Sequence, residues 1–159
     1  MTFAPGITGL VVIDPYNDFI SEGGKVWDRL KGVAEANGCI PHMKQVLDEF
    51  APQPGDIVAQ EHWCSSGFAN TDLDLLLKKH GIGELIVIGL IAHSCVEATV
   101  RYGAELGYQV TVVKDATTSY SDDHMHAALE INLPNYAAVV STVEVVDAIR
   151  TASNTRRGT

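Results

Sequence analysis

Cysteine is scarce in this sequence, and an export signal is lacking. Among 159 residues there are three cysteines, an odd number, and none are spaced as Cys-x-x-Cys. Neither a disulfide framework nor a zinc knuckle is therefore expected. Residues 1–9 have no basic start and no long apolar run, which predicts that no secretory signal is present. Together these absences predict a protein of a reducing, cytoplasmic compartment.

Basic residues and long apolar runs are also lacking. Eleven lysines and arginines oppose 20 acidic residues, for a formal net charge of -9, which argues against nucleic acid or an anionic membrane as a partner. No stretch approaches the ~20 apolar residues that a membrane span needs. With 46% hydrophobic residues the composition is globular. We expect one domain over residues 1–150, followed by a polar tail at 151–159.

Short apolar runs alternate with amphipathic segments along the chain. The runs predict strands buried on both faces, at residues 10–13, 56–60, 84–89, 109–113 and 137–141. Helices are expected at residues 31–47, 72–80, 95–106, 121–132 and 142–150, the last with a capping box of Ser141 and Glu144. This alternation predicts a three-layer α/β protein with a parallel sheet and helices on both faces.

Groups capable of chemistry follow three of the expected strands. Asp14 ends the first strand, Glu61 and His62 follow the second, and Cys95 comes shortly after the third. Ligands of parallel sheets bind at the carboxyl ends of the strands. We therefore expect these groups along one edge of the sheet.

Cys95 and Asp14 each have a catalytic and a structural interpretation. A helix start lowers the pKa of a thiol from ~8.5 and offers amides for an oxyanion, which favours a nucleophilic Cys95. Free cysteine is also among the most buried residue types, which favours a structural thiol. Asp14 could accept the thiol proton and later return it, or it could form a turn before Pro15.

The remaining candidates have similar alternatives. His62 could supply a positive charge to Asp14 and Cys95, or lie on an exposed loop, and Glu61 competes for the same role. His93 could contact substrate or simply line the turn before Cys95. Aromatic side chains could line an apolar pocket or belong to the core; they are Tyr16, Phe19, Trp63 and Phe68.

Four segments together resemble a known family. They are "VVIDPYNDF", "HWCSSGFANTDLDLLLKKHGI", "ELIVIGLIAHSCVEATVRYGAELGYQVTVVKDA" and "STVEVVDAI", and they are similar to the isochorismatase-like cysteine hydrolases, which include nicotinamidases and N-carbamoylsarcosine amidohydrolases. The resemblance implies a flavodoxin-like fold and an Asp–Lys–Cys triad whose Asp and Cys map onto Asp14 and Cys95. It also implies a cis peptide at Leu90–Ile91 and an oxyanion hole formed by the amides of Ile91 and Cys95.

The chain departs from the family pattern in three places. His62 stands where the family has lysine, four residues before Ser66 of the Ser-x-Phe motif. The connection between the helix ending near Leu47 and the expected strand at residues 56–60 is short, so the sheet would lose an outer strand and the pocket part of its wall. Nicotinamidases hold zinc through an Asp-x-His pattern, which "AQEHW" lacks, so we predict no metal and no cofactor.

These observations favour a hydrolase that cleaves a small amide through a thioester on Cys95. The residues expected to bind the small-molecule substrate are Phe19, Trp63, Phe68 and His93. An ether hydrolase of the isochorismatase type is a second interpretation, because "GLIAHSC" resembles the corresponding stretch of those enzymes. A catalytically silent binding or assembly protein is a third. The resemblance also implies a homo-oligomer, a dimer or larger.

Overall fold

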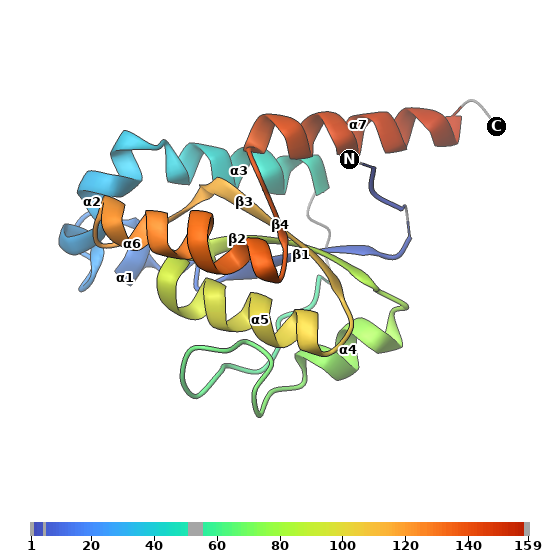
Figure 1. Ribbon diagram of the computed structural model, residues 1–159, viewed down its shortest axis with the longest axis horizontal. Helices are drawn as coiled ribbons and strands as arrows, with labels where there is room; N and C mark the ends of the chain where they lie inside the picture. Colours follow the sequence, from blue (N-terminus) through green and yellow to red (C-terminus); the bar gives the residue numbers. More distant parts are fainter. Residues whose placement is uncertain (1, 5, 51–55, 158–159) are drawn as a thin grey trace.

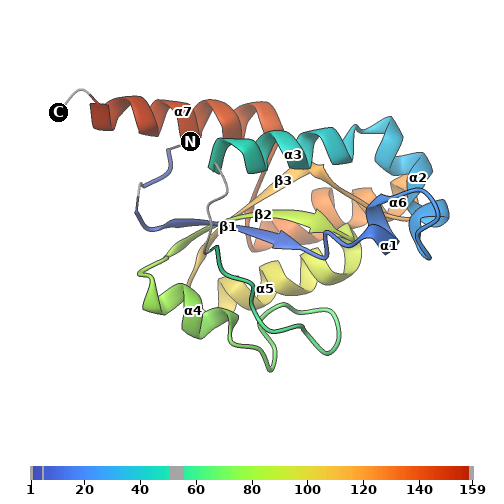
Figure 2. The same ribbon diagram turned by 180° about the vertical axis from the view of Figure 1, so that it is seen from behind.

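A four-stranded parallel sheet forms the centre of the computed structural model, which describes residues 2–4, 6–50 and 56–157. Its strands lie in the order β1 (Thr8–Ile13), β2 (Glu84–Leu90), β3 (Gln109–Thr118) and β4 (Ala138–Val140). Helices cover both faces of the sheet (Figure 1, Figure 2). This three-layer arrangement confirms the predicted α/β fold class.

The helices separate into the two outer layers. Preceding β2 are α1 (Asn17–Ile20), α2 (Trp27–Ala36), α3 (Cys39–Phe50) and α4 (Leu73–Lys79); following it are the π-helical turn η1 (Ala92–Val96) and α5 (Glu97–Glu105). After β3 come α6 (Asp122–His126), the π-helical η2 (Ala127–Asn132) and the 3-10 turn η3 (Leu133–Asn135), and α7 (Thr142–Arg157) follows β4. In Figure 1, α3 and α7 run along one face of the sheet and α4 and α5 along the other. No helix among the described residues has the length and apolar character needed to cross a membrane.

The side chains of β2 alternate between two apolar cores. Ile86 and Ile88 point into the core that includes side chains of α2, α3 and α7. Leu85 and Val87 point into the other core, with side chains of α5 and η2. Successive side chains of a strand face opposite sides of the sheet, so a strand covered on both faces must be apolar at every position. This explains the unbroken apolar run that the sequence shows here.

The predicted strand at residues 56–60 is wrong. These residues form no regular structure in the described chain, and the side chains of Ile57 and Val58 are 52% and 92% exposed. A strand persists only where a neighbour takes its backbone hydrogen bonds and covers one of its faces. The described sheet ends at β1, in agreement with the prediction that the short connection removes an outer strand.

The helix expected at residues 31–47 is two helices. The break falls at Gly38, whose φ of 68° belongs to the left-handed region that glycine adopts readily. Pro41 does not interrupt α3, because it lies in the first turn, where a backbone N–H has no partner within the helix.

The capping box at the start of α7 is confirmed. The backbone N–H of Ser141 donates to Glu144 Oε2 at 2.7 Å, and the N–H of Glu144 donates to Ser141 Oγ at 3.4 Å. The helix then continues to Arg157, so residues 151–157 of the predicted tail are helical.

Candidate active site

Asp14 lies at the carboxyl end of β1, where the backbone packs tightly against β2. Ile13 is opposite Gly89 in the parallel register, and a Cβ built on Gly89 would lie 2.1 Å from the carbonyl oxygen of Ile13. Only glycine permits this approach. Asp14 itself has a φ of 49° and is 7% exposed; Asp tolerates this left-handed conformation better than most residues. The turn therefore directs a buried carboxyl group towards the end of β2.

Cys95 lies in the π-helical turn η1, directly after β2. The peptide bond between Leu90 and Ile91 is cis, at the position that the family resemblance implies. The N–H groups of Ser94 and Val96 both donate to the carbonyl oxygen of Ile91, at 3.1 and 3.3 Å. The sequence predicts a helix beginning at Cys95, but the helical turn begins at Ala92 and becomes α-helical only at Glu97. Turns of this π type are frequent at functional sites.

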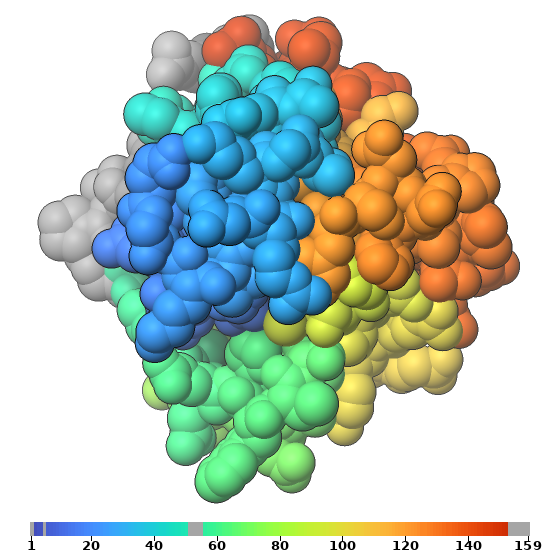
Figure 3. All heavy atoms as spheres, turned by 90° about the vertical axis from the view of Figure 1, so that its left-hand side faces the viewer, coloured from blue at the N-terminus to red at the C-terminus, as the bar shows by residue number. Residues whose placement is uncertain are grey.

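The structure brings Asp14, His62 and Cys95 together. His62 Nε2 is 2.9 Å from Asp14 Oδ1. A carboxylate oxygen, a ring nitrogen and the Cys95 sulfur all lie within 4.8 Å of one another. Figure 3 views the edge of the sheet at which they meet, where the segment after β1 (blue), the segment around residues 62–70 (green) and α6 (orange) adjoin. Three residues distant in sequence thus form one cluster at the carboxyl ends of β1 and β2.

His62 is held at both ring nitrogens. Its Nδ1 hydrogen-bonds to the carbonyl oxygen of Cys64, while Nε2 faces Asp14. Burial alone would lower the pKa of His62. The hydrogen bond to Asp14, the negative charge of Asp14 and the hydrogen bond to the Cys64 carbonyl outweigh burial, so the pKa of His62 lies above its ordinary value. Glu61, the competing candidate, is exposed and instead accepts a hydrogen bond from Tyr16 Oη at 3.4 Å.

The Cys95 thiol holds its proton in this environment. Burial, followed by the hydrogen bond and charge of Asp14, raises the pKa of Cys95 to about 12. Hydrogen bonds from the Ser94 side chain and the backbone amide of Ile91 lower the pKa of Cys95, but their effect is smaller. A thiol of this kind reacts as a nucleophile only if a base removes its proton during the reaction, and Asp14 is close enough to do so.

His93 extends the polar surroundings of the cluster. Its Nδ1 hydrogen-bonds to Ser119 Oγ, and its ring stacks on His124 with centroids 4.3 Å apart. Burial, followed by the charge of His124, lowers the pKa of His93. No pattern in the sequence indicates the contacts with Ser119 and His124, because they depend on how the end of β3 and α6 pack against η1.

The three aromatic side chains expected to bind substrate lie in different environments. Phe68 is 4% exposed and stacks on Tyr108 and Tyr102, at centroid distances of 5.6 and 6.1 Å, as part of the core. Trp63 is 86% exposed. Phe19 is half-buried against the core beneath α2 and α3. The core alternative therefore describes Phe68 better than a role in substrate binding.

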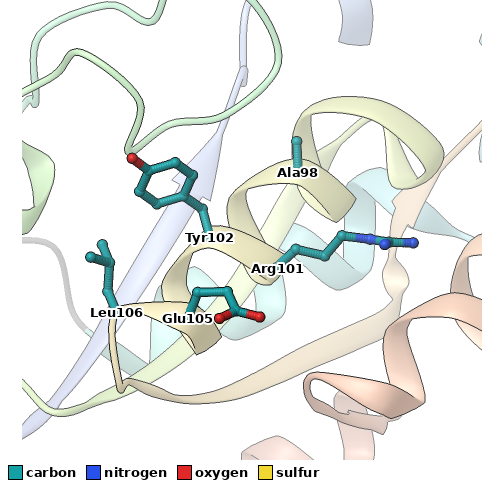
Figure 4. Close-up of a pocket in the computed structure, with 5 residues that line it drawn as sticks. All are labelled: Ala98, Arg101, Tyr102, Glu105 and Leu106. Atoms are coloured by element: carbon teal, nitrogen blue, oxygen red, sulfur yellow. The ribbon is translucent and has the colours of Figure 1, made fainter.

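A shallow hollow of about 430 Å³ lies elsewhere on the surface. Figure 4 shows its lining side chains along the outer side of α5, namely Ala98, Arg101, Tyr102, Glu105 and Leu106. Neither Asp14, His62 nor Cys95 contributes to it. This hollow is therefore separate from the cluster.

Comparison with known proteins identifies relatives. Ureidoacrylate amidohydrolase RutB of Enterobacter sp. (strain 638) is 40% identical over 113 residues, which cover 70% of this chain and 49% of RutB. A cysteine hydrolase from Pseudomonas syringae pv. phaseolicola 1448A superimposes with a TM-score of 0.80 at 21% identity, covering 96% of both chains. N-carbamoylsarcosine amidase from Thermoplasma acidophilum gives a TM-score of 0.64 at 21% identity, covering 85% of this chain and 96% of that one.

These similarities differ in what they establish. At 21% identity, the two solved structures show a shared fold. The chain spans about half the length of RutB, the curated relative that it matches. The profile of the isochorismatase domain matches residues 35–145, more than half of the chain. The chain therefore belongs to the isochorismatase family.

Proposed function

We propose that this protein is a cysteine hydrolase that cleaves a small amide or a related C–N bond through a thioester intermediate. The observation that carries the proposal is the contact cluster of Asp14, His62 and Cys95, in which a protonated thiol lies beside a buried carboxylate. The names of two similar proteins, an amidohydrolase and an amidase, favour amide substrates over ethers.

The first half of the reaction forms the thioester. Asp14 takes the proton of the Cys95 thiol as the sulfur attacks the carbonyl carbon of the substrate. The carbonyl π electrons move onto oxygen, and the amides of Ile91 and Cys95 stabilise the resulting oxyanion. The C–N bond then breaks, and the leaving amine receives the proton from Asp14.

The second half regenerates the enzyme. A water molecule gives a proton to Asp14 and attacks the thioester carbonyl. The C–S bond breaks, the proton on Asp14 returns to the sulfur, and the acid product leaves. His62 is a positioning residue in this scheme, because its hydrogen bond at 2.9 Å fixes the carboxyl group that moves the proton.

The direct test replaces the sulfur. Cys95→Ala is expected to abolish release of ammonia or amine from a panel of small amides and ureido acids. The far-ultraviolet circular dichroism spectrum should remain that of the wild type. His80→Ala, at an exposed position at the end of α4, is the matched control and should keep full turnover.

Intact-mass spectrometry adds a test that does not need turnover. With an activated ester of a substrate acid, the wild type should gain one acyl group and Cys95→Ala should gain none. Full activity of Cys95→Ala, or an acyl group on another residue, would contradict the thioester mechanism.

A further inference from the structure

Asp14, His62 and Cys95 are all able to ligate a metal ion. A carboxylate oxygen, an imidazole nitrogen and a cysteine sulfur are the donor atoms that proteins use for Zn²⁺. In the described part of the chain, this is the one group of three or more His, Cys, Asp and Glu side chains gathered closely enough to share an ion. The donor set differs from the Asp-x-His pattern whose absence led to the prediction of no metal.

The separations of the donor atoms suit a small tetrahedral ion. Zn–S bonds of ~2.3 Å and Zn–N or Zn–O bonds of ~2.0–2.1 Å place the donors about 3.3–3.6 Å apart. Here, His62 Nε2 and Asp14 Oδ1 are 2.9 Å apart, and no pair in the cluster exceeds 4.8 Å. Binding of an ion would therefore draw the more distant donor atoms of the cluster closer together.

The ring of His62 is oriented as a ligand. Its Nδ1–H donates to the carbonyl oxygen of Cys64, and Nε2 is directed at Asp14, where it offers a lone pair to an ion once its own proton has left to solvent. Metal-binding histidines nearly always donate their other N–H to a carbonyl or carboxylate in this way. The main chain at Cys64 thus provides the outer support that a metal site needs.

The residue at position 62 decides whether this cluster can hold a metal. A lysine ammonium has three donors and no lone pair, so the family's usual Asp–Lys–Cys set offers two ligands. Histidine converts the same set into three, with a fourth position left for water because both His62 and Cys95 are only half-buried.

We propose that Asp14, His62 and Cys95 bind one Zn²⁺ ion, which competes with substrate for the Cys95 sulfur. This inference concerns metal binding by the free protein and goes beyond the proposed hydrolysis. A thiol that coordinates a metal ion is deprotonated, and its proton passes to the solvent. Sulfur bonded to Zn²⁺ is not available to attack a carbonyl, and a chelator restores it.

Cobalt makes the ligands visible. The full chain, freed of metal with a chelator and kept reduced, is titrated with Co²⁺, and the absorption spectrum is recorded. One equivalent should produce a sulfur-to-cobalt charge-transfer band in the near ultraviolet. Adding one equivalent of Zn²⁺ should abolish that band, and a chromogenic chelator then gives the zinc affinity.

Variants locate the ligands. His62→Lys and Cys95→Ala should each weaken Zn²⁺ binding by at least ~10–100-fold, the loss expected even for outer-shell partners. The matched control His80→Lys should bind as the wild type does. Cys64→Ala keeps the carbonyl that orients His62 and should retain the charge-transfer band; its loss would place the thiolate ligand at Cys64 and overturn the proposal.

The outcome on the wild type does not depend on any variant folding. Absence of a stoichiometric thiolate band in the wild type overturns the proposal, as does unchanged zinc affinity in a folded His62→Lys variant. Zinc binding without amide turnover would leave this proposal standing and count against the proposed hydrolysis. Amide turnover without zinc binding would overturn this proposal and support the proposed hydrolysis.

Discussion

His62 Nε2 lies 2.9 Å from Asp14 Oδ1, although 48 residues separate the two in the sequence. The other ring nitrogen faces the carbonyl oxygen of Cys64. Both partners are hydrogen-bond acceptors, so the ring satisfies both when each nitrogen carries a proton. Histidine at this position can therefore pair with the carboxylate as a lysine would, but only in its charged form, and its planar ring is held at both ends.

This pairing makes the stability of the protein depend on pH. The pKa of His62 is raised in the folded protein, where Asp14, Cys64 and the charge of Glu61 favour the imidazolium and burial opposes it. A raised pKa stabilises the fold fully below the unfolded value of ~6.5, and this stabilisation is lost as the pH rises through the folded value. We expect the difference in unfolding free energy between wild type and His62→Gln to be largest near pH ~6 and to shrink towards pH ~9.

Urea denaturation at several pH values, with a chelator present, measures this difference. The chelator matters because a bound metal would stabilise the fold independently of protonation. A difference that is constant over this range, or that grows with pH, would show that His62 is not charged beside Asp14.

Replacing Asp14 should separate the reactivity of the thiol from catalysis. Asp14→Asn removes the carboxylate whose hydrogen bond and charge, after burial, contribute most to the raised pKa of Cys95. The thiolate then becomes more accessible, so iodoacetamide should alkylate Cys95 faster than in the wild type at pH ~8. Amide turnover should nevertheless fall by ~10²–10⁴-fold, the usual contribution of a general base.

Peptide mass spectrometry distinguishes alkylation at Cys95 from alkylation at the other two cysteines. If turnover and alkylation of Cys95 instead fall together in Asp14→Asn, Asp14 does not hold back the thiolate in the resting protein, and the expected separation is wrong.

Much of the site could be predicted because a parallel sheet gathers the ends of its strands. The apolar run before Asp14 and the run before Cys95 are long enough to identify as strands, and β1 and β2 do pair in parallel with their ends aligned. Proximity of Asp14 and Cys95 then follows from topology alone. The segment before His62 is not a strand, yet its loop still brings the ring to Asp14.

The parts that sequence reasoning missed depend on a partner distant in the chain. Residues 56–60 have the composition of a strand, but composition does not show whether a neighbour is present to accept the hydrogen bonds. The sequence does not show that the ring of Phe68 stacks on those of Tyr102 and Tyr108, which places it in the core. The exposure of a side chain and the tautomer of His62 are likewise set by tertiary contacts.

Gly89 offers a test of how the backbone positions the cluster. A methyl group at this position would lie 2.1 Å from the Ile13 carbonyl oxygen, and the φ of 118° is unfavourable for any residue with a Cβ. The main chain of β1 or β2 must move to relieve the clash. We expect Gly89→Ala to reduce the unfolding free energy by about 2–4 kcal/mol, the upper part of the range for point mutants.

Gly32 is the matched control for this substitution. It lies within α2, and no atom comes within 4 Å of a Cβ built on it, so Gly32→Ala should stabilise the protein by about 0.5–1 kcal/mol. Under conditions where Gly89→Ala remains folded, amide turnover should still be lost, because the displaced strand end carries Asp14 away from Cys95. Wild-type stability together with wild-type turnover in Gly89→Ala would show that the close approach of β1 and β2 does not set the geometry of the site.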